Sequence, residues 1–370
     1  MKVLFICGAL ELGRDGVGDY TRRFATEIMS HRHKAAVIAL NDQYIDEYTV
    51  ENSNELQLIR IPAKYPDNIK YDYAKKYISA FNPEWISLQF VPFAFDKRGL
   101  IFGLGNRLRE IAEHAHWHIM FHELWVGKDE KSNWKRLLIS ITQKILIKRM
   151  IQTIRPKVIH TQLPVFYNKI NSLGWGVQQL PLCSNIEVVK QKSNKENNIF
   201  RVGFFSQIDA SESIVTFLKL LGEKLFEADL ELEILLIGGN EAKMKNTGKI
   251  LENSVYLKRP VKYTGFLNSQ HVSEAIHSCK IGITSVPRHA LGKSGSVAAF
   301  ITHKIPVASP NIHFMYNPTD IGFFSKDLCD AIITQPDLKK IEIAESAAII
   351  GSDKIQLSTI VETFLADLNG

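Results

Sequence analysis

Short apolar segments alternate with helix-length segments along most of this 370-residue chain. The apolar segments are KVLFICGAL, AAVIAL, LQLIRI, WISLQFV, HIMFHE and KVIHTQ. They are rich in Val, Ile, Leu and Phe and lack strict polar alternation, which is typical of buried parallel strands. Helix-length segments separate several of them, at residues 20–31, 73–81, 101–114 and 134–154. The pattern predicts an α/β fold.

The alternation pauses at LPLCSNIEVVKQKSNKENN, which loses its apolar periodicity and indicates a linker. A second series follows, with FRVGFFS, LEILLIGGN, VKYTGFL and KIGITSV as strands and helices over residues 212–226 and 269–279. We therefore predict two Rossmann-like domains, 1–185 and 199–352, whose parallel sheets face each other across a cleft. A helix at 353–370 is expected to pack back on the first domain. Ligands of such domains bind at the carboxyl ends of the strands.

Residues 285–309 predict an anion-binding turn in the second domain, with a strand end, a Gly/Ser-rich turn, a helix opening near Ser296 and another strand. A helix N-terminus has unpaired N–H groups and the positive end of the helix dipole. Lys293 adds a cation, Ser294 and Ser296 add hydroxyls, and Gly295 lets a ligand approach the backbone. Because the spacing matches neither a P-loop nor GxGxxG, an ordinary strand-to-helix turn stays the alternative.

Composition changes this picture little. The chain is 45% hydrophobic and 23% charged, as in ordinary globular proteins. Four scattered cysteines form no CxxC pair, which favours a reducing cytosol. No run of about 18 apolar residues is present, so no membrane span is predicted.

The net charge of +6 is concentrated in the first half of the chain. Residues 1–184 have 25 Lys and Arg against 18 Asp and Glu, whereas the remainder has 20 against 21. This bias suits an anionic membrane surface or an acidic acceptor, although a solvated face is a commoner cause. Nucleic-acid binding is not expected, because the basic residues do not cluster with aromatic ones. We expect a cytoplasmic protein whose basic first domain associates peripherally with the inner face of the membrane.

Two other patterns receive ordinary interpretations. His114, His116 and His118 alternate in HAHWH, which would place three imidazoles on one strand face, but no carboxylate or cysteine accompanies them and we predict no metal site. In WKRLLISITQKILIKRMIQTIRP, apolar residues cover most of the helical circumference. That distribution favours a packed helix with basic ends over a membrane-surface helix.

Several segments, in this order and spacing, resemble a GT-B glycosyltransferase of the family 4 type. They are GVGDYTRRFATEI, IMFHELWVG, LPLCSNIE, VGFFSQ, VKYTGFLNSQHVSEAIHSCKIGITSVP and the turn ending in HKIPVAS, and together they span nearly the whole chain. The resemblance implies a retaining transfer of sugar from a nucleotide-sugar, without a metal or other cofactor. It places the donor, most simply a UDP-sugar such as UDP-glucose, in the second domain. The acceptor, a saccharide or a lipid-linked compound in polysaccharide or glycoconjugate biosynthesis, belongs to the first.

The resemblance also implies residues for the donor diphosphate. Gly16 and Gly18, with Gly13, resemble the glycine turn that approaches the diphosphate from the first domain, since glycine lets backbone N–H groups reach phosphate. These glycines alternatively only turn the chain into its first helix. In the second domain, Lys293 corresponds to a basic residue that counters charge on the leaving nucleotide, with Ser294, Gly295 and Ser296 holding phosphate oxygens.

The remaining roles concern the sugar, the acceptor and the nucleoside. His122 matches the active-site histidine beside the donor sugar and is, with Lys293, our candidate catalytic residue. A structural histidine is the alternative. Glu123 is assigned to the acceptor or sugar, or else caps the turn, and Arg288 is assigned likewise, or else is an exposed loop arginine. The resemblance points to four residues for the base and ribose, Tyr263, Thr264, Gly265 and Phe266, although Phe266 fits a core position equally well.

The chain departs from the family pattern at positions that matter. The family has two glutamates eight residues apart around the phosphate turn, but the aligned residues are Leu291 and Ala299. The Arg and Lys expected after the first strand of the second domain are also missing from FFSQIDASES. A non-catalytic GT-B-like binding or scaffold protein, and a nucleotide-sugar epimerase on the same fold, therefore stay open as alternatives.

Overall fold

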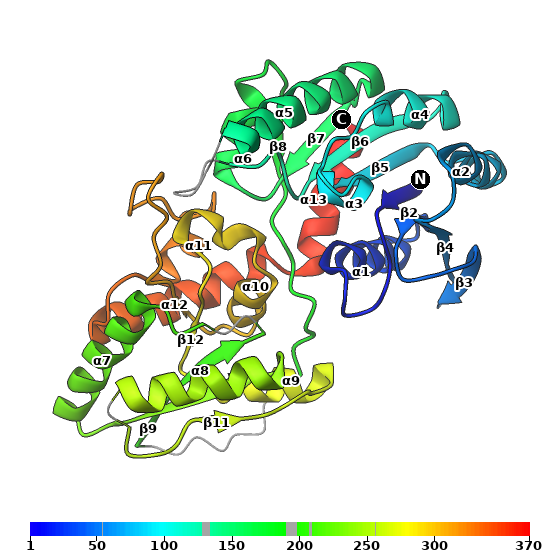
Figure 1. The fold of residues 1–370 in the computed structure, drawn as a ribbon. Coiled ribbons are helices and arrows are strands. Elements are labelled where there is room, and N and C mark those ends of the chain that lie inside the picture. The colour runs from blue at the N-terminus through cyan, green and yellow to red at the C-terminus, as the bar shows by residue number, and fades with distance from the viewer. Residues whose placement is uncertain (54, 128–133, 190–197, 207–208, 256) are drawn as a thin grey trace. The chain divides into compact units, whose positions relative to one another are not determined.

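The computed structural model describes residues 1–53, 55–127, 134–189, 198–206, 209–255 and 257–370 (Figure 1). The chain forms two compact units. The first comprises Met1–Leu180 together with Val361–Gly370, and the second comprises Pro181–Ile360. Of the predicted linker, residues 190–197 lie outside the described residues. Each unit is built on a sheet of parallel strands, so the predicted α/β fold is confirmed.

The first unit contains an eight-stranded sheet in the order β3-β4-β2-β1-β5-β6-β7-β8. All neighbours are parallel except β3 and β4. The strands are β1 (Lys2–Cys7), β2 (Lys34–Asp42), β3 (Thr49–Ser53), β4 (Leu56–Pro62), β5 (Trp85–Phe90), β6 (His116–Phe121), β7 (Val158–Thr161) and β8 (Gln178–Gln179). β1, β5 and β6 are almost entirely buried, which explains their continuous apolar sequences.

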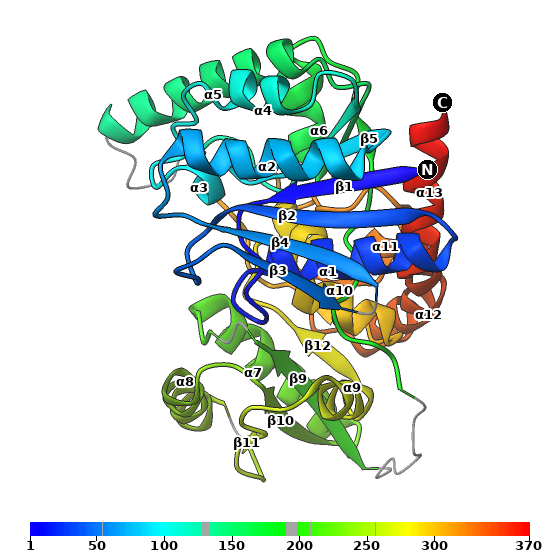
Figure 2. The ribbon, with the colours of Figure 1, turned by 90° about the vertical axis from the view of Figure 1, so that its right-hand side faces the viewer.

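Helices cover both faces of this sheet (Figure 2). They are α1 (Gly16–Ser30), α2 (Asp67–Phe81), α3 (Pro92–Phe95), α4 (Leu104–Ile111), α5 (Trp134–Ile154), α6 (Pro164–Asn171) and the end of α13 (Leu357–Asn369). The predicted bounds of α5 are confirmed. α1 begins four residues earlier than predicted, because Asp15 caps it through the backbone N–H of Gly18.

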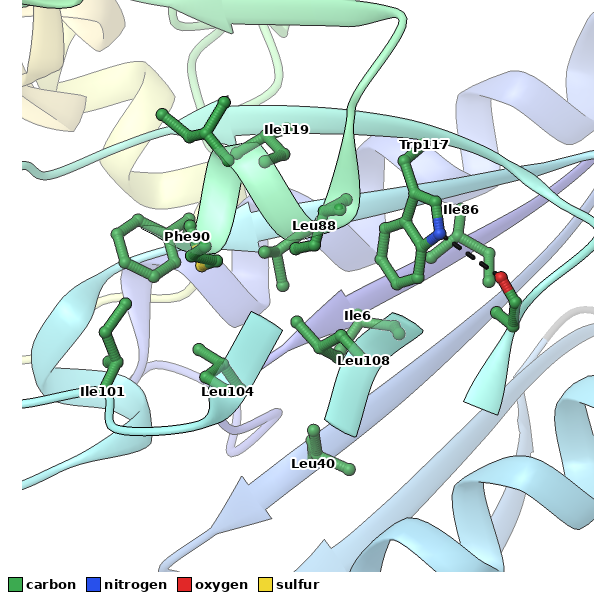
Figure 3. Packing of buried hydrophobic residues seen from close by; sticks show 14 of the residues in the cluster. Ile6, Leu40, Ile86, Leu88, Phe90, Ile101, Leu104, Leu108, Trp117 and Ile119 are labelled. Atoms are coloured by element: carbon green, nitrogen blue, oxygen red, sulfur yellow. Dashed lines mark hydrogen bonds between the residues drawn. The ribbon is translucent and has the colours of Figure 1, made fainter. Parts of the chain in front are cut away.

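Both faces of the first sheet carry apolar cores. On the face covered by α4 and α5, Trp117, Leu88 and Leu108 pack together, and Trp117 Nε1 donates to the carbonyl of Ala112 (Figure 3). On the face covered by α1 and α13, Phe364 packs against two phenylalanines, with ring centroids 6.2 Å from Phe5 and 5.1 Å from Phe24. Burying one such phenylalanine contributes roughly 1.5–3 kcal/mol. The end of α13 is thereby fixed to the first unit.

The second unit contains a six-stranded parallel sheet in the order β11-β10-β9-β12-β13-β14. The strands are β9 (Ile199–Phe205), β10 (Glu231–Ile237), β11 (Lys262–Tyr263), β12 (Ile281–Ile283), β13 (Val307–Ala308) and β14 (Ile332–Ile333). The helices are α7 (Glu212–Glu227), α8 (Glu241–Ser254), α9 (Ser269–His277), the 3₁₀ helix η1 (Arg288–Lys293), α10 (Gly295–Thr302), α11 (Lys326–Asp330) and α12 (Leu338–Lys354).

The two sheets share a strand order that positions their loops. In each, the first strand is central, the next parallel strands lie on one side of it and the later strands on the other. The order reverses between β1 and β5 in the first unit, and between β9 and β12 in the second. Ligands of doubly wound sheets bind where this reversal occurs, beyond the carboxyl ends of the strands. The loops after β1 and β12 therefore lie where a ligand of each sheet is expected.

Candidate functional site

The predicted phosphate turn follows β12 in the second unit. Here α10 begins at Gly295, one residue from the predicted start, and is capped by Ser294, whose hydroxyl accepts from the N–H of Val297 at 3.4 Å. Lys293 and Gly295 are exposed, and a Cβ at Gly295 would meet no atom within 4 Å. The first turn of α10 thus combines an exposed cation with an open approach to helical N–H groups.

The segment before α10 differs from the prediction. Instead of a Gly/Ser-rich turn, the 3₁₀ helix η1 leads directly to Lys293. Gly292 N–H donates to the carbonyl of Gly322 at 3.1 Å, and a Cβ at Gly322 would lie 2.6 Å from the carbonyl oxygen of His289. Close backbone packing therefore fixes η1, which the glycine content of the sequence alone did not indicate.

The predicted contact of Arg288 with acceptor or sugar meets a structural obstacle. Nε, Nη1 and Nη2 of Arg288 donate to the carbonyls of Ser309, Pro318 and Thr334, at 2.9, 2.9 and 3.1 Å. Burial lowers the pKa of this guanidinium. The alternative of an exposed loop arginine is wrong, because the side chain is half-buried and ties three chain segments together. Ligand binding by Arg288 stays a prediction without geometric support.

Of the residues predicted for the base and ribose, Tyr263 ends β11 and the other three lie in the loop after it. Thr264 Oγ1 accepts from the N–H of Gly238 at 3.0 Å, which joins this loop to the loop after β10. Gly265 has φ +66°, a conformation that glycine adopts without strain. Phe266 is 94% exposed, so the core alternative for this residue is wrong. An exposed aromatic ring at the carboxyl edge of the sheet suits stacking on a planar base.

The two positions where the family has glutamates lie inside the second unit. Leu291 and Ala299 are both almost fully buried, as part of η1 and α10. Carboxylates at such positions would need buried partners, and apolar side chains pack there instead. The two family glutamates are therefore replaced by side chains that form part of the second unit's apolar packing.

In the first unit, the glycine loop after β1 is largely satisfied by the chain itself. Gly18 N–H donates to Asp15 Oδ1 at 2.7 Å, and Gly13 N–H lies 3.1 Å from Asp19 Oδ2. A Cβ at Gly18 would lie 2.4 Å from the carbonyl oxygen of Ala9, so backbone packing alone requires glycine there. Gly13 and Gly16 are both exposed with open space beside them, but only Gly16 belongs to the start of the helix.

Two carboxyl groups lie beside this loop. Asp15 and Asp19 lie at the N-terminus of α1, and burial raises the pKa of both carboxyl groups. A carboxylate here already uses the positive end of the helix dipole that a phosphate would need. Diphosphate binding by Gly16 and Gly18 stays a prediction, and these two carboxylates oppose it.

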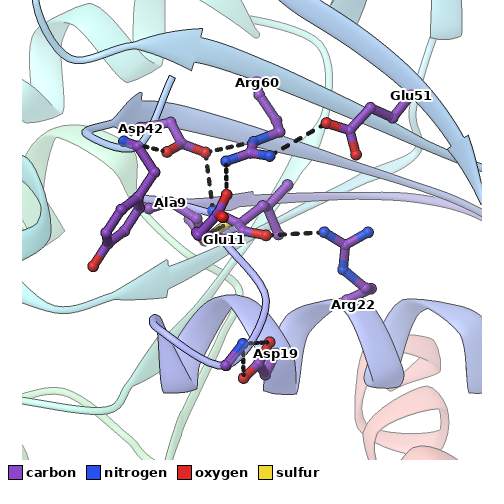
Figure 4. Close-up of polar contacts among 11 residues, drawn as sticks. Ala9, Glu11, Asp19, Arg22, Asp42, Glu51 and Arg60 are labelled. Carbon is purple, nitrogen blue, oxygen red and sulfur yellow. Dashed lines mark hydrogen bonds and ion pairs between the residues drawn. The ribbon is translucent and has the colours of Figure 1, made fainter. Parts of the chain in front are cut away.

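A buried ion-pair network fixes the loop to the sheet (Figure 4). Asp42 is fully buried and accepts from Leu10 N–H at 3.1 Å and from Arg60 Nε at 2.8 Å. Arg60 also pairs with Glu11 at 2.7 Å and Glu51 at 3.3 Å. Burial lowers the pKa of Arg60, but these hydrogen bonds more than offset it, so the pKa is raised overall. The loop after β1 is thereby held on the ends of β2 and β4.

The candidate catalytic histidine directly follows β6. His122 is buried, with Nε2 2.8 Å from Gln89 Oε1 and Nδ1 3.2 Å from Gln162 Nε2, and the ring of Tyr20 packs on its edge. Burial lowers the pKa of His122 to about 3, so the ring is neutral at physiological pH. Both ring nitrogens therefore have partners within the first unit. A catalytic role for His122 stays a prediction, as does a ligand role for Glu123, which is half-buried beside it.

His122 belongs to a longer chain of hydrogen bonds. The links run from Asp367 Oδ2 to His160 Nε2 (2.9 Å), from His160 Nδ1 to His118 Nε2 (3.0 Å), from His118 Nδ1 to Ser87 Oγ (2.8 Å), and from Ser87 Oγ to Gln89 Nε2 (2.7 Å). The Gln89 amide fixes the role of His122, because Gln89 Nε2 donates to Ser87 and Gln89 Oε1 only accepts. Nε2 of His122 therefore carries the proton, and Nδ1 accepts from Gln162 Nε2.

The sequence did not predict most of this series of hydrogen bonds. The alternation of His116 and His118 was noticed, but the strand begins at His116, so His114 does not share its face. His118 is fully buried and bonded to Ser87 and His160, and the described residues form no cluster able to hold a metal ion. Among those residues, no helix combines the length and the apolar character that crossing a bilayer requires.

A second feature was missed at the reversal of strand order in the second sheet. Ser206, directly after β9, has φ +66°, a strained conformation for a residue with a side chain. The next two residues of FFSQIDASES lie outside the described residues. Positive φ at Ser206 could not be read from the sequence, because serine gives no such signal.

Comparisons place this fold among known ones. No family model and no curated protein matches the chain. Solved structures match over its whole length. Sucrose-phosphate synthase from Thermosynechococcus elongatus is 12% identical, with a TM-score of 0.59 over 98% of this chain and 97% of that one. HepE of Anabaena, solved with UDP-glucose, is 13% identical, with a TM-score of 0.59 over 100% and 99%.

A third structure, the pneumococcal O-GlcNAc transferase GtfA in complex with UDP and GlcNAc, is 8% identical, with a TM-score of 0.60 over 100% of this chain and 98% of that one. These neighbours are GT-B glycosyltransferases, and the fold class predicted from the sequence is confirmed. The assignment to family 4 stays a prediction.

Proposed function

We propose that this chain is a retaining, metal-independent glycosyltransferase. It transfers a sugar from a UDP-sugar, such as UDP-glucose, to a saccharide or lipid-linked acceptor in polysaccharide or glycoconjugate biosynthesis. The observation that carries the proposal is the start of α10, where Lys293 and the exposed Gly295 follow the strand at which the order of the second sheet reverses. The full-length likeness to glycosyltransferases solved with UDP-glucose or UDP supports the same donor class.

In this proposal the second unit binds the donor. Lys293 pairs with the diphosphate, and the N–H groups of Gly295 and Ser296 donate to its oxygens, because the helix terminus favours negative charge. Phe266 provides an apolar surface for the base. As the bond between the anomeric carbon and the diphosphate breaks, negative charge grows on the leaving oxygen, and these donors stabilise it more than they stabilise the ground state.

The retaining step is a substitution on one face of the sugar. The acceptor oxygen forms its bond to the anomeric carbon on the side from which the diphosphate leaves. The acceptor proton passes to an oxygen of the leaving phosphate, so protons and charge balance without a separate base. A neutral His122, whose pKa is far below 7, orients hydroxyls in the first unit and does not remove the proton. We place this reaction in the cytoplasm, with the first unit peripherally at the inner face of the membrane.

A second candidate function is a non-catalytic nucleotide-binding or scaffold protein. The burial of Leu291 and Ala299 favours it, because no carboxylate at either position can bind the donor sugar or the ribose. An epimerase on the same fold is the third. Incubating the protein with a panel of nucleotide-sugars separates all three. Slow release of UDP without acceptor supports the transferase, an isomerised donor supports the epimerase, and stable donor supports the scaffold.

Nucleotide binding itself is tested by thermal unfolding with UDP, GDP and ADP. A ligand at about 100 times its Kd stabilises the folded state by about 2.7 kcal/mol, which raises the melting temperature by several degrees. We expect this shift with UDP alone. The absence of a shift with all three nucleotides would contradict both the transferase and the epimerase.

A further inference from the structure

α5 has apolar side chains on two opposite faces. One face packs into the first unit through residues that include Ile147, Met150 and Ile154. Five further large apolar side chains are 43–68% exposed: Trp134, Leu137, Leu138, Ile141 and Ile145. At about 100° per residue these five fall within one arc of about 100°, opposite the buried face. The prediction of a packed helix is therefore right for one face and wrong for the other.

Basic residues surround this outward apolar stripe. α5 contains Lys135, Arg136, Lys144, Lys148 and Arg149 and has no Asp or Glu. From Trp134 to Ser184 the sequence contains eight Lys and Arg and no acidic residue, which accounts for the positive charge of the first half of the chain. Lys135 also lies over the ring of Trp134, with Nζ 5.6 Å from its centroid. An apolar stripe bordered by cations is complementary to the surface of an anionic bilayer.

A basic hollow adjoins the end of this stripe. It lies between α4 and α5, has a volume of about 630 Å³, and is lined by Arg109, Arg149 and Arg155 among other residues. Within the described part of the chain, none of these three guanidinium groups forms an ion pair. Phe102, 60% exposed, also lines the hollow. Three guanidinium groups around a hollow of this size suit a phosphate headgroup.

We propose that the outward face of α5, together with this arginine hollow, docks the first unit onto a bilayer containing anionic phospholipid. The five apolar side chains enter the boundary between headgroups and acyl chains, the lysines lie along the headgroups, and the arginines bind a phospholipid phosphate. This inference specifies the surface for the peripheral location in the proposed function. It does not depend on sugar transfer, because docking is measured without donor or acceptor.

The first experiment is sedimentation of the full chain with vesicles. We expect binding to vesicles of phosphatidylcholine and phosphatidylglycerol in equal amounts, and none to phosphatidylcholine alone. Binding should weaken as salt rises, because counterions screen the lysines and arginines. Equal binding to both vesicles, or to neither, would overturn the proposal.

The stripe is tested with Leu138→Glu/Ile141→Glu. Both side chains point outward, so the fold should stay intact, and vesicle affinity should fall by about tenfold or more because two charges must enter the apolar boundary. The matched control is Ile349→Glu/Ile350→Glu on α12, where the side chains are similarly exposed. That control should bind as the unaltered protein does. Circular dichroism and melting temperature check the fold of all variants.

The charges are tested with Lys144→Glu/Lys148→Glu, with Lys219→Glu/Lys339→Glu in the second unit as the control of equal charge change. Each basic residue near an anionic surface strengthens binding, so the first pair should lower affinity by about tenfold or more and the control by far less. Equal effects would mean that net charge, not this surface, attracts the membrane.

The hollow is tested in the same assay with Arg109→Gln/Arg149→Gln, which should reduce the preference for phosphatidylglycerol.

Other occupants of the stripe give distinguishable results. If α5 pairs with a second copy, light scattering shows a dimer that Leu138→Glu/Ile141→Glu converts to a monomer. If a protein partner covers the stripe, vesicles do not bind. Either result rejects the membrane proposal and leaves the transferase proposal untouched. Conversely, unchanged docking in a protein that binds no nucleotide would reject only the transferase.

Discussion

The carboxyl edges of the two sheets satisfy their polar groups in opposite ways. In the first unit, Asp15 and Asp19 occupy the backbone donors around the start of α1, and both nitrogens of His122 have partners. In the second unit, the start of α10 has an exposed Gly295 with open space beside it, and Phe266, which follows β11 in the same sheet, is almost fully exposed.

This difference indicates that the polar groups in the first unit provide rigidity, whereas those in the second unit are suited to binding a ligand. A polar network that is fully bonded internally holds its side chains in place but has few donors left for a ligand. A helix start with open space beside it and an exposed lysine next to it is accessible to an anion. We call the carboxyl edge of the first unit's sheet, with the start of α1 and His122, the first edge. The carboxyl edge of the second unit's sheet, with the start of α10 and Phe266, is the second edge. We expect substitutions at the first edge to change stability, and substitutions at the second edge to change nucleotide affinity.

The largest effect should come from Asp42→Ala at the first edge. Removing this carboxylate leaves the buried Arg60 with only its two half-exposed partners, and breaking a buried pair costs about 3–5 kcal/mol. The measurement is urea unfolding followed by tryptophan fluorescence. All five tryptophans, Trp85, Trp117, Trp125, Trp134 and Trp175, belong to the first unit, so the signal reports that unit alone.

The comparison variant at the second edge is Ser294→Ala, which removes a helix cap worth about 1 kcal/mol. It should leave the tryptophan-detected transition unchanged and lower the second unit's stability only slightly. If Asp42→Ala costs less than this cap, the first edge is not the rigid one.

Acid should destabilise the first unit more than the second. Burial lowers the pKa of His118 well below its usual value and that of His122 to about 3, whereas in the unfolded chain both titrate near 6.5. The unfolded chain therefore binds more protons below pH 6.5, so the stabilisation is complete above that pH and is lost as pH falls. From pH 7 to 5.5 each histidine costs about 1.3 kcal/mol, or about 2.5 kcal/mol together.

Urea unfolding at these two pH values, followed by tryptophan fluorescence, checks this expectation. In the second unit burial lowers the pKa of His303 to about 4, which predicts about half the loss there. His303→Gln should leave the tryptophan-detected pH dependence unchanged, and His118→Gln should halve it. A tryptophan-detected stability that is flat over this range would show that the two imidazoles are not neutral.

Lys293→Ala should weaken UDP binding by about 2 kcal/mol, or roughly thirtyfold, because it removes a charge-assisted bond to phosphate. Calorimetry measures the affinity. Lys280→Ala is the matched control, since this exposed lysine precedes β12 at the opposite, amino edge of the same sheet. Unchanged affinity in Lys293→Ala, or an equal loss in the control, would remove the second edge as the phosphate site.

Local signals in the sequence predicted the fold well. α5 was placed within its observed bounds because it contains neither Gly nor Pro and is apolar around most of its circumference. The start of α1 was misplaced because the cap, Asp15, was read as part of a glycine turn. β3 was missed because TVENS is a polar, antiparallel edge strand without the apolar run of the others.

The candidate site was predictable only where its partners are close in sequence. Ser294 caps α10 three residues away, so the helix start was found. Arg288 bonds to carbonyls 21–46 residues distant, and backbone carbonyls have no sequence signature. The chain from Asp367 to His122 is built from β5, β6 and the ends of β7 and α13, and only the three-dimensional fold brings these segments together.

The smallest effect is expected at Asp367, at the end of the series of hydrogen bonds that leads to His122. Asp367→Leu removes the one acceptor whose role is fixed by its charge, and the half-buried bond to His160 should cost about 1 kcal/mol in the tryptophan-detected transition. Asp353→Leu, an exposed aspartate on α12, is the control and should cost nothing measurable there. The second readout is the tautomer of His122, which Asp367→Leu should leave unchanged because the amides of Gln89 and Gln162 set it. Long-range ¹H–¹⁵N spectra, with His122→Gln for assignment, should show the proton on Nε2 in both proteins. A proton on Nδ1 in the unaltered protein would mean that the two amides are oriented the other way round.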